Sequence, residues 1–286
     1  MTVSIVTDST SDIDAGFAKE LGITVVPLTV SFGQEHFLDG VSISPEEFYR
    51  RLSTENVFPT TTQPSPGVFG EIYKKLAREN DEILVICISS RLSGTYQSAL
   101  SARSLAPASC RVEIIDSKMV VMALGLAVIK AAGMARQGQK LDAIIGALKL
   151  QLPRTQPIMY FDTLKYLAKG GRIGRAQSLL GSLLSVKPIL TLEDGEVAPL
   201  TRVRSRQAGM DYLYNFAAGH KEIEALAVEH AAADADAEAL INRLGGLFPK
   251  EKIYRAQVGP VVGTYSGPGV VAVTVVGRKE AGAAKA

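Results

Sequence analysis

The sequence has few of the residues that build disulfide frameworks or metal centres. It contains two cysteines and three histidines in 286 residues. Two cysteines cannot form a disulfide framework, and Cys87 lies inside an apolar run, so we expect reduced thiols and a cytoplasmic protein. The cysteines and histidines also lack the spacing of metal ligands. We therefore expect no metal ion and no cofactor.

The sequence also lacks a marked excess of charge and a long apolar segment. It has 31 basic and 29 acidic residues, a net charge of +2, which gives no reason to expect a nucleic acid partner and favours at most transient membrane contact. The first residues are too uncharged for a signal peptide and reach Asp8 at once. The most apolar window, residues 119–135, contains Lys130 and several small residues, so it predicts a core helix rather than a membrane span.

The central feature is an apolar run at residues 83–88 followed by a polar turn. The run predicts a strand buried on both faces of a parallel sheet. Residues 89–95 are mostly Ser, Gly and Thr, and a helical pattern begins at Tyr96. A turn at the carboxyl end of a central strand is a common ligand site, where backbone N–H groups suit a carboxylate or phosphate. Alternatively, Ser93 or Thr95 only caps the helix.

Two further polar turns are candidates for the same site. Residues 7–12 follow a short strand at 3–6, and residues 59–67 include three consecutive threonines, more than capping requires. Asp12 is placed to cap the next helix. Ser44, Pro45 and Glu47 mark another helix start, with a capping box.

The order of elements predicts an α/β protein of two domains. In residues 1–155 the strands alternate with helices, which predicts a parallel-sheet α/β domain; these strands are at residues 3–6, 23–30, 83–88 and 112–115. Residues 156–280 predict an α/β domain with a mixed or antiparallel sheet, because Asp194 and Gly195 indicate a hairpin. Its strands are expected at 158–161, 187–192, 197–203, 225–229, 253–258 and 270–276, with a turn at 263–269 and a helix at 178–184. Residues 281–286 are expected to be a flexible tail.

Three kinds of chemistry remain open on the residues alone. Ser93 and His230 are the components of a serine-dependent acyl hydrolase, although Ser93 is not in a G-x-S-x-G turn. Arg172 in a glycine-rich basic turn fits a sugar-phosphate or nucleotide, although the turn lacks the Lys-Ser/Thr of a phosphate-binding loop. The hydroxyl clusters without an adjacent base fit the binding of an anionic head group whose acyl chain fills an apolar slot.

Seven segments, in order, resemble the DegV family of bacterial fatty-acid-binding proteins. Together they extend over the chain to about Gly277: residues 7–12 (TDSTSD), 59–65 (PTTTQPS), 89–96 (SSRLSGTY), 115–117 (IDS), 167–173 (LAKGGRI), 187–190 (KPIL) and 263–269 (GTYSGPG). The resemblance implies two α/β domains with a ligand tunnel between them. It also implies a non-enzymatic protein that binds a long-chain fatty acid and presents it to a separate ATP-dependent fatty acid kinase subunit, its partner, for acyl phosphate formation.

The resemblance also implies roles for individual residues. Thr61 and Ser93 would bind the fatty acid carboxylate, with Thr62, Gly94 and Thr95 on the same rim, and Arg172 and Arg204 would face the kinase partner or the phosphate. Tyr265 stands where the family commonly has a histidine. A phenol can donate a hydrogen bond to a carboxylate but stays neutral near pH 7, so this departure affects coupling to phosphorylation more than lipid binding. The hypothesis depends on an elongated apolar channel that reaches these hydroxyls.

Overall fold

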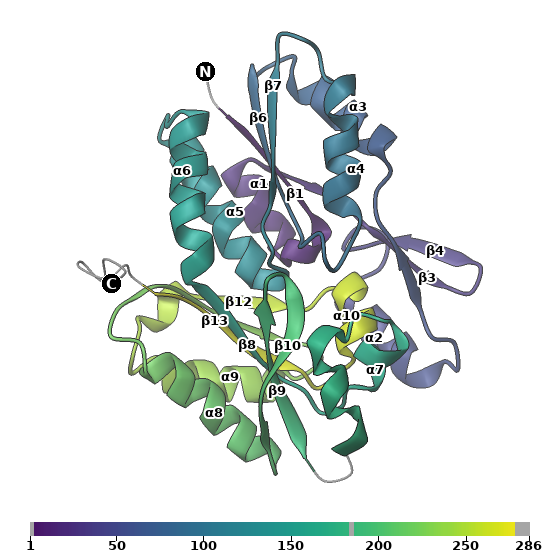
Figure 1. Ribbon diagram of the computed structural model, residues 1–286, viewed down its shortest axis with the longest axis vertical. Coiled ribbons are helices and arrows are strands. Elements are labelled where there is room, and N and C mark those ends of the chain that lie inside the picture. Colours follow the sequence, from purple (N-terminus) through teal and green to yellow (C-terminus); the bar gives the residue numbers. More distant parts are fainter. Residues whose placement is uncertain (1–2, 183–185, 278–286) are drawn as a thin grey trace.

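Two large β-sheets, each with its own helices, and one small sheet organise the chain (Figure 1). The computed structural model describes residues 3–182 and 186–277. The first sheet is entirely parallel and has the strand order β2-β1-β6-β7, which confirms the predicted parallel α/β domain. Its strands are β1 (Ser4–Asp8), β2 (Ile23–Val26), β6 (Glu82–Cys87) and β7 (Arg111–Asp116).

Both faces of the first sheet are covered by helices, so its central strand is apolar throughout. Ile83, Val85 and Cys87 of β6 belong to the cluster formed with α3 and α4, whereas Leu84 and Ile86 belong to the core on the opposite face. This alternation is the side-chain period of a strand buried on two sides. The helices are α1 (Ala15–Leu21), α3 (Pro66–Leu76), α4 (Thr95–Ser101) and α6 (Leu141–Gln151).

The second sheet is mixed, as predicted, with strand order β10-β9-β8-β13-β11-β12. Neighbouring strands are antiparallel except β11 and β12, which are parallel. The strands are β8 (Thr155–Tyr160), β9 (Lys187–Glu193), β10 (Glu196–Val203), β11 (Ile223–His230), β12 (Ile253–Gln257) and β13 (Val271–Gly277). Helices α8 (Arg206–Ala218) and α9 (Asp234–Leu244) pack on one face.

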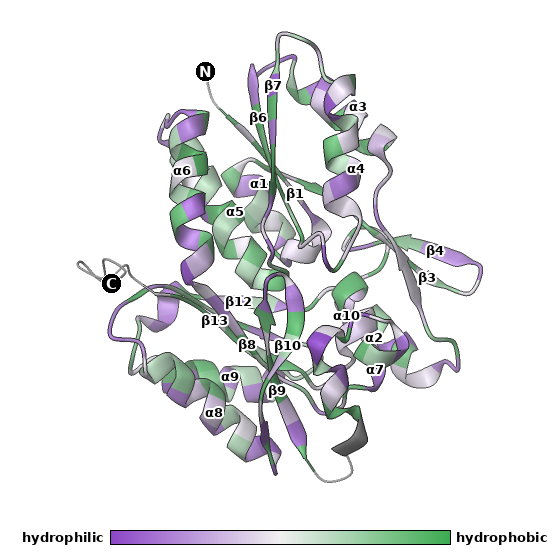
Figure 2. Ribbon diagram, viewed as in Figure 1, coloured by the Kyte–Doolittle hydropathy of each residue, from purple (hydrophilic) through white to green (hydrophobic). Residues whose placement is uncertain are grey.

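Helix α5 (Val121–Arg136) lies between the two sheets. It contacts β1 and β6 of the first sheet and β8 and β11 of the second. The helix's own side chains are apolar on most of its sides, and Figure 2 shows the helix largely in green, the colour of hydrophobic residues. A helix that is apolar all round is a buried helix, which confirms the predicted core helix. Within residues 3–182 and 186–277, no helix is long and apolar enough to cross a membrane.

The predicted strand at residues 23–30 is wrong in its extent. It divides at Pro27 into β2 and β3 (Thr29–Phe32), and β3 belongs to a third, antiparallel sheet with the order β4-β3-β5. Pro27 has no N–H to continue the ladder, so the chain leaves the parallel sheet there. The other strands of the small sheet are β4 (Glu35–Leu38) and β5 (Thr60–Thr62), and β5 occupies the segment predicted as a polar turn.

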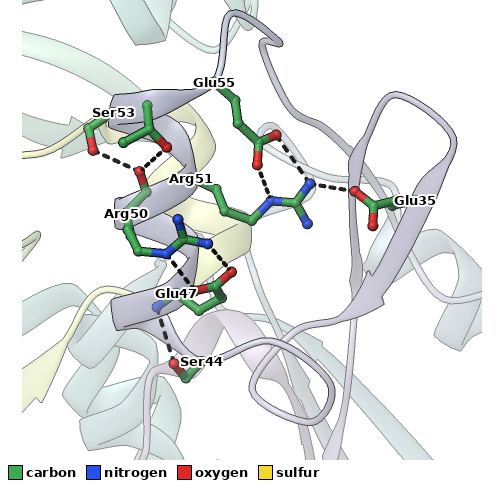
Figure 3. Close-up of polar contacts among 8 residues, drawn as sticks. Glu35, Ser44, Glu47, Arg50, Arg51, Ser53 and Glu55 are labelled. Carbon is green, nitrogen blue, oxygen red and sulfur yellow. Dashed lines mark hydrogen bonds and ion pairs between the residues drawn. The ribbon is translucent and has the colours of Figure 1, made fainter.

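Helix α2 (Pro45–Thr54) holds the small sheet in place (Figure 3). Ser44 accepts a hydrogen bond from the Glu47 backbone, as the capping pattern predicted. The guanidinium of Arg51 binds Glu55 on its own helix and Glu35 on β4, and it lies 4.4 Å from the ring centroid of Phe32 on β3. Because Arg51 is largely buried, this pairing fixes the β3–β4 hairpin, and with it the neighbouring β5.

Other local expectations need correction. The glycine-rich turn at 263–269 contains the end of a helix, α10 (Pro260–Ser266), which packs on α2 and α7 (Lys165–Lys169). The helix predicted at 178–184 is a 3-10 helix, Gly174–Ser182, and 183–185 lie outside the described residues, as does the predicted tail at 281–286. Asp14, not Asp12, caps α1. The remaining 3-10 helices are Ser9–Ser11, Ala102–Leu105, Leu152–Arg154 and Lys250–Lys252.

Candidate functional site

A cavity lies between the two lobes and is lined by residues from both halves of the chain. It contains about 890 Å³ of space that no atom fills, part of it open to solvent. Most of its wall is apolar. The apolar lining residues are Leu28, Ile88, Leu92, Val120, Val121, Met159, Phe161, Leu167, Leu192, Val197, Val258, Val261, Val262, Val270 and Ala272.

The polar lining residues that reach solvent form the mouth of the cavity, which we define as Thr61, Gln63, Ser93, Arg172 and Tyr265. The Thr61 and Tyr265 hydroxyl oxygens lie 2.5 Å apart. The Arg172 guanidinium carbon lies 4.9 Å from the ring centroid of Tyr265. Hydroxyl groups and a cation therefore meet at one opening of an otherwise apolar cavity, an arrangement suited to an anionic head group with an apolar tail.

Ser93 lies at the mouth because it belongs to the turn between the carboxyl end of the central strand β6 and the start of α4. Its Oγ lies 2.8 Å from Oγ1 of Thr95 and accepts a hydrogen bond from the Thr95 N–H at 3.3 Å. The N-cap of α4 is Gly94 and no side chain caps the helix, so the capping alternative is wrong; Ser93 instead contacts Thr95 and borders the cavity. Gly94 leaves room for Gln63, since a Cβ at Gly94 would lie 2.8 Å from the Gln63 Nε2.

Tyr265 occupies a position that depends on Gly170. A Cβ at Gly170 would lie 2.3 Å from Cδ1 of Tyr265, too close for any other residue type without movement of the ring. Arg172 follows two residues later and donates to the carbonyl of Gly170 at 2.9 Å, and to that of Leu92 at 3.4 Å. The glycine-rich basic turn therefore packs against Tyr265 and places a cation at the mouth.

The structure does not bring the other predicted site residues to the cavity wall. Thr62 is exposed and points to the opposite side of β5 from Thr61, as neighbouring strand residues do. Gly94 is exposed, and Thr95 is fully buried. Arg204 is exposed in the link from β10 to α8. None of these four is among the lining residues.

The predictions from sequence missed a group of buried carboxyl groups, one of which, Glu229, lines the cavity. Burial raises the pKa of Asp39 to about 6 and that of Glu229 to about 7. Burial and the nearby Asp39 and Glu229 raise the pKa of Asp12 well above its ordinary value, and burial also raises the pKa of Asp8. Glu229 interrupts an apolar strand, and that interruption was the available signal in the sequence. In the described part of the chain, no group of three or more His, Cys, Asp or Glu side chains is arranged to hold a metal ion.

The structure does not pair Ser93 with His230. The Nδ1 of His230 accepts a hydrogen bond from the Ala233 N–H at 3.3 Å, and its Nε2 lies 3.6 Å from Asp234. His230 is not among the residues that line the cavity, whereas Ser93 contacts Thr95. A nucleophile must lie within hydrogen-bond reach of its base, so this geometry does not support the hydrolase hypothesis.

Comparison with known proteins finds similarity along almost the whole chain. Residues 2–278 match the family model described as "Uncharacterised protein, DegV family". A DegV domain-containing protein of Caldanaerobacter subterraneus subsp. tengcongensis is 39% identical over 279 residues, which is 95% of this chain and 97% of the relative. A DegV domain-containing protein of Streptomyces coelicolor is 38% identical over 281 residues, covering 96% and 99% of the two chains.

Solved structures also match this chain over almost its whole length. A Thermus thermophilus DegV family protein, described in terms of fatty acid binding, superposes with a TM-score of 0.89 at 32% identity, over 97% of this chain and 100% of the other. DegV of Bacillus subtilis, described as a fatty acid binding protein, gives a TM-score of 0.89 at 30% identity with the same coverage.

Proposed function

The chain belongs to the DegV family, and from this premise we propose that it binds a long-chain fatty acid. The acyl chain occupies the apolar cavity, and the carboxylate lies at the mouth, where the hydroxyls of Thr61, Ser93 and Tyr265 donate hydrogen bonds to it. The protein acts as a carrier rather than as an enzyme. Support comes from fatty acid binding in the Thermus thermophilus and Bacillus subtilis relatives.

The proposal rests on one observation: the cavity wall has an apolar inner part and a polar mouth. Its inner part consists mainly of aliphatic side chains, which stabilise a buried acyl chain by about 0.8 kcal/mol for each methylene group. Its mouth consists of hydroxyl groups beside Arg172. Hydrogen bonds from neutral hydroxyls to a carboxylate are charge-assisted, so they hold the head group without a buried positive charge.

The test is to identify what the purified protein carries. Protein expressed in a bacterial host is denatured, and the extract is analysed by mass spectrometry. We expect a long-chain fatty acid in a substantial fraction of the molecules. Delipidated protein is then titrated with a fluorescent fatty acid, and a folded protein that neither carries nor binds an acid would overturn the proposal. Retention of a sugar phosphate or nucleotide instead would favour the alternative that uses Arg172.

We further propose that the protein presents the bound fatty acid to a separate ATP-dependent fatty acid kinase subunit. The mouth is the part of the cavity that reaches solvent, and the exposed Arg172 beside it is available to the γ-phosphate or to an acidic surface of the partner. Arg204 is exposed as well and belongs to the same proposal.

The partner proposal is tested by reconstitution. The loaded protein, ATP and a DegV-dependent kinase subunit are combined, and acyl phosphate is trapped with hydroxylamine as a hydroxamate. We expect hydroxamate only when all three are present. The Arg172→Ala variant should retain its fatty acid and lose most of the product. Hydroxamate formed by the protein and ATP alone would contradict the carrier role.

A further inference from the structure

Glu229 is an ionisable side chain in the wall of the cavity and is fully buried. The structure shows two charged residues in that wall among the described residues, Arg172 and Glu229. Arg172 is exposed at the mouth, whereas Glu229 is fully buried. Glu229 lies on β11 opposite Ala272 of β13, which also lines the cavity. The cavity therefore has a polar group in its interior as well as hydroxyls at its mouth.

Only part of the Glu229 carboxyl group is satisfied by the protein. Its Oε1 accepts a hydrogen bond from the Thr274 hydroxyl at 3.3 Å, and the carboxyl group also accepts one from the backbone N–H of Met122. Its Oε2 is shielded from solvent and has no hydrogen-bond partner among the described residues. A buried carboxyl oxygen without a partner is costly, so an unpartnered atom of this kind in a ligand cavity indicates a missing partner.

The neighbouring hydroxyls of the cavity do not supply that partner. The Thr10 hydroxyl donates to Oδ1 of Asp8 at 2.5 Å, and the Ser266 hydroxyl donates to the carbonyl of Gly267 at 3.3 Å. The other interior lining residues are apolar and have no donor. These lining residues therefore leave Oε2 of Glu229 open to a hydrogen bond with the molecule that fills the cavity.

An unmodified acyl chain fits the aliphatic wall but leaves this carboxyl oxygen without a partner. An acyl chain that carries a hydroxyl group at the position of Glu229 can donate a hydrogen bond to Oε2, so this oxygen then has a partner. A buried polar group that is paired in one complex and unpaired in another discriminates strongly between the two ligands.

We propose that the preferred ligand of this protein is a hydroxylated long-chain fatty acid, whose hydroxyl group, remote from the carboxylate, donates a hydrogen bond to Glu229. This inference rests on the proposed function, because it assumes that an acyl chain fills the cavity with its carboxylate at the mouth. It adds a second polar contact in the interior, which selects for a class of acyl chain.

The experiment compares stearic acid with hydroxystearic acids whose hydroxyl group lies in the middle of the chain or on the penultimate carbon. Each competes with a fluorescent fatty acid for delipidated protein. We expect at least one hydroxylated isomer to bind the unmodified protein about tenfold or more tightly than stearic acid, the discrimination of one buried hydrogen bond. In the Glu229→Leu variant the order should reverse, because a hydroxyl then faces only apolar groups.

Controls separate this inference from the proposed function and from misfolding. The Glu229→Gln variant keeps a hydrogen-bonding side chain of the same shape, so we expect it to retain a preference for the hydroxylated acid. Stearic acid that binds the unmodified protein as tightly as every hydroxylated isomer would overturn the inference and leave the fatty acid function intact. A preference that survives in a folded Glu229→Leu protein would also overturn it. Failure of all the acids to bind would instead overturn the proposed function.

Discussion

The hydroxyl oxygens of Thr61 and Tyr265 lie 2.5 Å apart, although 204 positions separate the two residues in the chain. Thr61 is on β5 of the small antiparallel sheet, and Tyr265 is on α10, which connects β12 and β13 of the second sheet. Arg172, from a third segment, lies over the Tyr265 ring. The mouth of the cavity is therefore complete only when both halves of the chain are folded and packed together.

The first prediction concerns Tyr265. The Tyr265→Phe variant loses a donor at the mouth and leaves the Thr61 hydroxyl without its partner. We expect fatty acid binding to weaken by about 1 to 3 kcal/mol, the range for a hydrogen bond to a charged group. Titration with a fluorescent fatty acid measures the change. The matched control is Tyr254→Phe, since Tyr254 is half-buried on β12 and does not line the cavity, and it should bind as the unmodified protein does.

The second prediction concerns Ser93. The Ser93→Ala variant should weaken carboxylate binding by about 1 to 3 kcal/mol, because the Oγ at the mouth is removed without any change in the apolar wall. The fatty alcohol of the same chain length, which has no carboxylate, should lose less affinity. An exposed serine, Ser104, provides the control variant Ser104→Ala. Unchanged affinity for the acid in Ser93→Ala would show that this residue has no role in head-group binding.

Local patterns in the sequence predicted those elements whose residues repeat with the period of their own structure. The strand at 83–88 was recognised because both of its faces are apolar, and the core helix expected within residues 119–135 corresponds to α5 because that window is almost entirely apolar. The strand expected at 23–30 ran through Pro27, so neither the break there nor the small antiparallel sheet that begins beyond it was predicted. That sheet depends on Arg51 and on pairing with residues 60–62, and neither has a signal in the neighbouring sequence.

The candidate site likewise contains residues that sequence motifs predicted and residues that they did not. Thr61, Ser93 and Arg172 were predicted from motifs, and the structure brings all three to the cavity. Thr62 was expected on the same rim but points away from the cavity, because the side of β5 that faces the cavity is set by register with β3. Glu229 was missed because its burial arises where the second sheet packs against α5.

The third prediction concerns the length of the acyl chain. Ala272 has the smallest side chain of the aliphatic wall and lies on β13 in the interior. An Ala272→Leu substitution adds volume inside the cavity, so we expect affinity for long acids to fall while affinity for acids shorter by several carbons is retained. Competition with a series of saturated acids measures the shift. An equal loss for every chain length, with an unchanged melting temperature, would contradict this role.

The last prediction follows from the buried carboxyl groups. Burial raises the pKa of Glu229 from 4.5 to about 7 and that of Asp39 from 3.8 to about 6. In the unfolded chain both groups lose their protons near their ordinary values. Between about pH 4 and pH 7 the unfolded state therefore holds fewer protons than the folded state, and the free energy of unfolding should fall as the pH rises. For Glu229 alone the fall is on the order of 3 kcal/mol, complete once the pH exceeds about 7.

Denaturant unfolding from pH 4.5 to pH 8 measures this dependence, with the delipidated protein so that ligand release does not contribute. In the Glu229→Gln variant the group cannot ionise in either state, so its contribution disappears and the decline should be shallower. Asp39 still ionises in this variant, so part of the decline remains. The control is Glu79→Gln, at an exposed glutamate after α3, which should follow the unmodified protein. Parallel curves for Glu229→Gln and the unmodified protein would show that Glu229 does not hold its proton in the folded state, because a raised pKa at that position requires the unmodified protein to lose stability relative to the variant between about pH 4.5 and pH 7.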